Sequence, residues 1–167
     1  MFGAYAAAAV ILAASVAIGL ALWRLTGWER ASFCAPAAGF ALLLIVCDVA
    51  ARLPGRTVTA AVAAGVLVVL SGLVLFAAPY PPALVAGDGF VLSVLSLVLV
   101  GLPFAVSGHF GVLGVGDNND MSVHMGASYW LQTHAVQQDF MLVKPGYPLG
   151  PHSLAATLGT GLGISVE

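Results

Sequence analysis

Long apolar runs occupy most of the first hundred residues of the chain, and short polar or proline-containing stretches separate them. A helix needs roughly 20 predominantly apolar residues to cross the hydrocarbon core of a bilayer, and the runs supply that length four times. The apolar residues do not alternate with polar ones as they would in half-buried strands, so helices are predicted. The expected spans are residues 3–23, 33–51, 58–78 and 88–107.

The stretches between these runs contain the residues expected at the ends of membrane helices. Arg24 to Arg30 follows the first span, Arg52 to Arg56 the second, and Pro79 to Pro82 the third. Arginine, tryptophan and tyrosine favour the interface, while proline and glycine end helices. Because arginines flank both sides of the second span, the positive-inside rule does not orient the chain.

Three features of the spans concern packing rather than chemistry. The first span carries small residues that would let another helix approach closely, namely Ala4, Ala7, Ala8 and Ser15. Asp48 lies four residues before Arg52, so the two can pair on one helix face. Cys34 and Cys47 lack the CxxC spacing of a zinc or redox site and are expected to act as small buried hydrophobes.

Composition agrees with the pattern. Hydrophobic residues make up 60% of the 167 residues and charged residues only 7%, whereas soluble domains carry roughly 25% charged residues. The formal charge of −2 excludes a basic nucleic-acid-binding surface. The sequence therefore predicts an all-α, polytopic helical membrane protein, with a transmembrane region at 1–107 and a polar loop with interfacial helices at 108–167. We expect the loop to continue into a C-terminal region beyond this chain.

Polar residues gather in two clusters of the last third, Gly116 to His124 and Gly146 to His152. Carboxylates and imidazoles beside membrane helices are costly to desolvate, so such clusters favour a functional role.

A helix is predicted from Asn119 to about Thr133 because an asparagine at its start can cap it and Asp120 would lie in its first turn. At helical spacing, one stripe contains Asp120, His124, Ser128 and Gln132, and the adjoining stripe contains Met121, Met125 and Tyr129, with Trp130 beside it. We expect the helix to lie along the interface, with its Met and aromatic face on the bilayer or bundle and its polar stripe facing an aqueous cavity. Gly150 and Pro151 predict the start of a second helix.

Asp117 and Asp120 are candidates for catalysis or metal binding. Carboxylate oxygens suit Mg²⁺ or Mn²⁺, and a carboxylate near an acceptor hydroxyl can serve as general base. The alternative is structural, with a turn at Gly116 to Asn119 and Asp120 as a charge at the helix start.

Asp117 to His124, followed by Tyr147-Pro148-Leu149-Gly150-Pro151-His152, resembles the first large loop of GT-C-type membrane glycosyltransferases. In that family an acidic residue follows an early span, an interfacial helix bears a histidine, and a Tyr-Pro motif leads into the next helix. Leu149 departs from the pattern, since a second proline is frequent at its position.

The resemblance implies that Asp120, or Asp117, is the catalytic or metal-associated carboxylate, and that His124, Tyr147 and His152 line the substrate cavity. It also implies a polyprenyl-phosphate-linked sugar donor, a cell-envelope glycan or protein acceptor, and a multi-pass protein of the cell membrane with an extracytoplasmic loop. Family members have about eight or more spans, so this chain would be an amino-terminal portion, inactive alone.

Two other function classes remain open. A proton- or ion-coupled transporter component could use Asp120, His124 and Asp139. A non-catalytic membrane module could use the polar loop as a structural cap that packs against a partner.

Overall fold

The computed structural model describes residues 2–27, 34–77, 119–133 and 149–163, together with Leu95, Val98, Leu99, Leu102 and Val106. The five helices within these ranges are α1 (Phe2–Thr26), α2 (Ala35–Ala51), α3 (Arg56–Ala77), α5 (Asn119–Thr133) and α6 (Gly150–Leu162). No strand occurs among the described residues. This confirms the all-helical prediction for this part of the chain.

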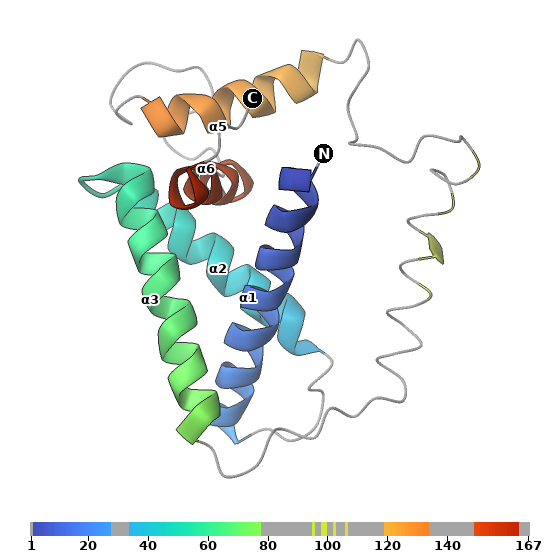
Figure 1. Cartoon of the computed structure of the whole chain (residues 1–167), viewed down its shortest axis with the longest axis vertical. Coiled ribbons are helices and arrows are strands. Elements are labelled where there is room, and N and C mark those ends of the chain that lie inside the picture. The colour runs from blue at the N-terminus through green and yellow to red at the C-terminus, as the bar shows by residue number, and fades with distance from the viewer. Residues whose placement is uncertain are drawn as a thin grey trace.

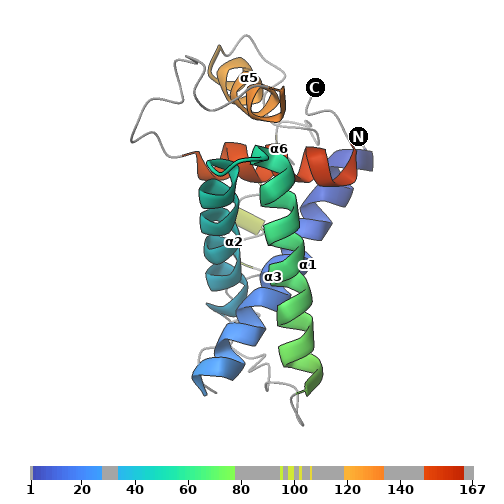
Figure 2. The same cartoon turned by 90° about the vertical axis from the view of Figure 1, so that its left-hand side faces the viewer.

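Helices α1, α2 and α3 form an antiparallel bundle, and α6 lies across one end of it (Figure 1). Turning the molecule by 90° shows α5 on the far side of α6 from the bundle (Figure 2). The amino-terminal end of α1 lies at the same end of the bundle as α5 and α6. Among the described residues, α5 and α6 therefore lie at one end of the bundle, and the opposite end is formed by the bundle helices.

Two of the helices are long and apolar enough to cross a membrane, within Ala6–Thr26 and Arg56–Ala77. The most apolar part of the second is only 11% buried inside the protein, as expected for a helix that faces lipid rather than the core of a soluble domain. Helix α2 is apolar but has 17 residues, the lower limit for a span. The predicted fourth span at 88–107 lies outside the described residues, apart from five single positions.

The turn between α2 and α3 confirms the predicted break. Helix α2 ends at Ala51 and α3 begins at Arg56, and Gly55 between them has φ +87°, a conformation that glycine adopts without steric cost. The predicted pair also forms, with Arg52 Nη2 donating to Asp48 Oδ1 at 3.1 Å.

A close contact joins α1 and α2 through their backbones. A Cβ atom on Gly39 would lie 2.6 Å from the backbone nitrogen of Gly19 and closer still to the carbonyl oxygen of Ser15, and one on Gly19 would collide with Ala35. Ser15 is buried, as predicted for a close contact, whereas Ala8 is exposed. The contact lies nearer the carboxyl end of α1 than the alanine-rich start of that helix does, because glycine permits a closer backbone approach than alanine.

The main core cluster joins the bundle to α6. Ile18 of α1, Leu43 and Cys47 of α2, and Leu154 of α6 are buried against one another. Cys47 is fully buried and carries a free thiol, in agreement with its prediction as a small hydrophobe. Cys34 is also free but only partly buried.

We predict that Gly39→Ala destabilises the bundle by about 2 kcal/mol, because the added methyl group must push apart two backbones that have no room to adjust. Gly72→Ala in α3 is the matched control, since a Cβ there meets nothing within 4 Å, and it should be neutral or stabilising by up to about 1 kcal/mol. The measurement is the free energy of unfolding in mixed micelles. Equal effects of the two substitutions would contradict the observed α1–α2 contact.

Candidate functional site

Helix α6 is the element that positions the candidate site. It begins at Gly150 with Pro151 in its first turn, as predicted, and ends before Gly163, whose φ of +64° gives a left-handed cap. Its buried residues occur on more than one face of the helix: His152, Ser153, Leu154, Ala156 and Thr157. A helix buried on several faces must contact more than one neighbour, and here the neighbours are the bundle and α5.

Helix α5 has the predicted bounds and packs on α6 through a small apolar cluster. Trp130 and Leu131 of α5 are buried with Leu149 and Ala156. One polar contact accompanies the cluster, in which Gln132 Nε2 donates to the carbonyl oxygen of Ala156 at 3.3 Å. These contacts fix the last turn of α5 on α6.

The two histidines of the predicted site meet at this contact. The distance from His124 Nδ1 to His152 Nε2 is 2.7 Å, which is a hydrogen bond. The ring centroids are 4.9 Å apart and the ring planes are tilted by 32°. His152 is only 6% exposed, and His124 is partly buried. Residues from two clusters separated by 28 positions are thus joined by their side chains.

This hydrogen bond restricts how many protons the pair can hold. One of the two facing nitrogens must donate and the other must accept, so a single proton lies between them. The pair can therefore be neutral or carry one positive charge, but two fully protonated rings would direct two N–H groups at each other. The same geometry lets a proton pass between the rings.

Burial lowers the pKa of His152 below its ordinary value of 6.5, and the charge of His124 lowers it further. Burial acts in this direction because it penalises the charged imidazolium. The pKa of His152 is thus lower in the folded state than in the unfolded state. The linked stability is fully present above about pH 6.5 and decreases as the pH falls below that value.

The remaining predicted site residues lie mostly outside the described part of the chain. Asp120 belongs to the first turn of α5, one helical turn before His124, but its side chain is not among those described. Asp117, Tyr147 and Asp139 lie outside the described residues. Within the described ranges, no three metal-binding side chains come together. The proposed Mg²⁺ or Mn²⁺ site of Asp117 and Asp120 therefore stays a prediction.

The orientation of α5 differs from the expected one. Ser128 is buried, and His124 and Gln132 contact α6, so the polar stripe faces a protein surface rather than an aqueous cavity. Met125 and Tyr129 of the adjoining stripe are exposed, as a face on the bilayer would be. The polar stripe can be buried because its groups are satisfied, His124 and Gln132 by α6 and Ser128 by the carbonyl oxygen of His124 within α5.

Sequence reasoning identified both histidines but not their direct bond. Their proximity depends on the packing of α5 on α6. The sequence indicated where these two helices begin, but not how they pack on each other. It also missed an apolar cleft of about 400 Å³ beside α6, since its aliphatic lining is indistinguishable from ordinary core residues.

Acidification should loosen the contact between α5 and α6. In a W23F/W28F background, Trp130 reports on this contact because it is buried between the two helices. We expect its emission to shift to the red as the pH falls from about 7.5 to about 5, because burial penalises the charged form of His152 that acid produces. His152→Gln should remove this pH response.

His109→Gln is the control for this experiment, since it removes a different imidazole and should leave the response intact. A response that persists in His152→Gln, or no response in the parent protein, would contradict the role of the histidine pair.

Comparison of the chain with protein-family models, curated proteins and solved structures finds no match. Function therefore has to be inferred from the polar segment itself, and above all from the histidine pair that joins its two clusters.

Proposed function

We propose that this chain is the amino-terminal part of a GT-C-type membrane glycosyltransferase, which transfers a sugar from a polyprenyl-phosphate-linked donor to a cell-envelope acceptor. The observation that carries the proposal is the hydrogen bond between His124 and His152. It joins one residue from each of the two polar clusters on which the family resemblance rests, at one end of a bundle with helices apolar enough to span a membrane.

The chemistry of such a donor matches a site at the end of a helical bundle. A polyprenyl-linked sugar keeps its hydrocarbon chain in the membrane and its phosphate and sugar at the surface. A histidine pair with one shared proton carries up to one positive charge, which suits the phosphate of the donor. Because His152 is partly desolvated, these interactions are less screened than they would be in open water.

The base in this proposal is Asp120, with Asp117 as the alternative. Its carboxylate accepts the proton of the acceptor hydroxyl as the glycosidic bond to the sugar forms, and the donor phosphate leaves with its lipid. Asp120 is preferred because it lies one turn before His124 in α5. Mg²⁺ or Mn²⁺ bound by the two carboxylates would offset the charge on the leaving phosphate.

The proposed location is the cell membrane, with α5 and α6 on the extracytoplasmic side. In this orientation the amino terminus is also outside, because it lies at the same end of the bundle as α6. Arg24 is then cytoplasmic, in agreement with the positive-inside rule, whereas Arg52 and Arg56 depart from it. Further spans, beyond this chain, would complete the donor site.

A second candidate is a proton-handling transporter component, and the histidine pair favours it as well because a shared proton can move between two imidazoles. In that case Asp120, His124 and Asp139 would form the pathway. The burial of Trp130 and Leu131 between α5 and α6 favours a third candidate, a structural cap without catalysis. Only the glycosyltransferase proposal requires the carboxylates of Asp117 and Asp120 for sugar transfer, so this requirement separates it from the other two candidates.

Sugar transfer by the full-length protein in membranes, supplied with labelled polyprenyl-linked sugars, tests the proposal. We expect Asp120→Asn or Asp117→Asn to lower transfer by about 100-fold or more, as loss of a general base does. Asp139→Asn should keep transfer within about twofold, since the proposal gives that carboxylate no role.

Unchanged transfer in both Asp117→Asn and Asp120→Asn would exclude the proposed base. Loss of proton flux across reconstituted vesicles in Asp139→Asn, without any sugar transfer by the parent protein, would instead favour the transporter.

A further inference from the structure

Helix α3 presents a stripe of exposed apolar residues along one face. The residues recur at alternating steps of four and three positions, as in a heptad pattern, and they are Val58, Val62, Gly65, Val69, Gly72 and Phe76. The four large side chains among them are between 59% and 92% exposed. The two glycines leave the backbone uncovered, since a Cβ atom added to either meets nothing within 4 Å. We call these six residues the α3 stripe.

The two exposed glycines indicate that another helix, rather than lipid alone, covers the α3 stripe. Glycine is less favourable than alanine inside a helix, and a position that faces only lipid gains nothing from it. Helix interfaces in membranes are enriched in small residues, because these residues let two backbones approach closely. Such interfaces accept alanine as well as glycine, so the small effect expected for Gly72→Ala is compatible with a helix contact at this position.

A second exposed apolar stripe lies within the predicted fourth span. Five residues of 88–107 are described, and all five are helical and aliphatic: Leu95, Val98, Leu99, Leu102 and Val106. Their spacing places them on one face of a helix, and they are between 52% and 80% exposed. Leu95 and Leu102 are one heptad apart, as are the two glycines of the α3 stripe. We call these five residues the 95–106 stripe.

The path of the chain brings the two stripes to the same side of the bundle. Helix α3 ends at Ala77, at the end of the bundle away from α6, whereas α5 begins at Asn119 beyond α6 (Figure 1). The chain must therefore return along the length of the bundle, in the direction opposite to α3. Consecutive elements are usually neighbours in space, and a bilayer holds two such helices side by side across the same hydrocarbon layer.

We infer that the 95–106 stripe packs antiparallel on the α3 stripe in the bilayer and adds a fourth helix to the bundle. One register places large residues on small ones, with Leu102 over Gly65 and Leu95 over Gly72. Each leucine then inserts where the backbone of α3 is uncovered, as a knob inserts into a hole. The heptad spacing of both stripes favours a shallow, left-handed crossing. The inference depends on the membrane location of the chain and not on sugar transfer.

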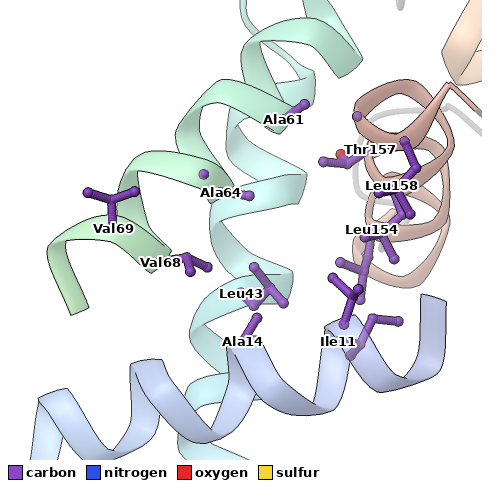
Figure 3. Close-up of a pocket in the computed structure, with 14 residues that line it drawn as sticks. Ile11, Ala14, Leu43, Ala61, Ala64, Val68, Val69, Leu154, Thr157 and Leu158 are labelled. Atoms are coloured by element: carbon purple, nitrogen blue, oxygen red, sulfur yellow. The ribbon is translucent and has the colours of Figure 1, made fainter. Parts of the chain in front are cut away.

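The apolar cleft beside α6 supports this register. The cleft has a volume of about 400 Å³, and Gly65 and Val69 of the α3 stripe are part of its lining. Figure 3 shows its α3 wall, where Ala61, Ala64 and Val69 lie on successive turns. No charged side chain lines the cleft, so water finds few partners there. A leucine at Gly65 lies at the mouth of the cleft and shields this aliphatic lining.

Disulfide crosslinking of the full-length protein in membranes tests the pairing. The parent protein carries Cys34→Ala, and Cys47 is kept because its side chain is fully buried. Two cysteines form a disulfide only when their Cα atoms lie within roughly 7 Å, so Gly65→Cys/Leu102→Cys should crosslink at least about fivefold more than Val66→Cys/Leu102→Cys. Val66 is the matched control because it is also exposed but points about 100° away around the helix.

A second pair leaves both glycines in place, should a cysteine at Gly65 prevent folding. Val69→Cys/Leu99→Cys follows the same register and should crosslink, whereas Leu70→Cys/Leu99→Cys should not, although Leu70 is also exposed. A protease site inserted within residues 78–90 identifies the chain that supplies each cysteine. After cleavage, a disulfide within one chain keeps its two parts joined until a reductant is added.

Three results would overturn the inference. The first is equal crosslinking in each pair and its control, and the second is no crosslinking in either pair. The third is a dimer linked through Gly65→Cys or Val69→Cys alone, which would assign the α3 stripe to a second copy of the chain. Because crosslinking is read without any sugar donor, its outcome is independent of the proposed glycosyltransferase activity.

Discussion

The docking of α6 across the end of the bundle is the interaction on which the other features depend. Leu154 inserts among Ile18, Leu43 and Cys47, and this burial of apolar surface holds α6 across the end of the bundle. With Leu154 fixed, His152 on the same helix is directed toward α5. The same placement closes one wall of the apolar cleft. One buried leucine thus supports both the polar and the apolar side of α6.

The hydrogen bond between His124 and His152 imposes a second constraint, which is electrostatic. A buried polar pair is tolerated only when its groups satisfy one another, and here each ring supplies what the other needs as long as one proton is shared. Charge on both rings at once is incompatible with the contact. The end of the bundle is therefore sensitive to protonation, whether the pair binds a phosphate, moves a proton or only joins two helices.

The sequence predicted the local structure well where single residues decide it. The ends of α1, α2 and α3 fall within three residues of the expected bounds, because arginines, prolines and glycines interrupt the apolar runs. Helices α5 and α6 begin where capping residues and Pro151 indicated. The close contact of Gly19 with Gly39 was not predicted, since the glycines of an apolar run look alike until another helix lies against one of them.

By itself the sequence determined that the chain forms apolar helices followed by a polar segment with two histidines at helix starts. These properties depend on composition, periodicity and capping, which act over a few neighbouring residues. Only the tertiary structure decided that His124 and His152 share a proton, that the polar stripe of α5 faces α6, and that apolar residues of four helices line a cleft. These features depend on contacts between residues far apart in the chain, and such contacts arise from the packing of whole helices, which no local pattern encodes.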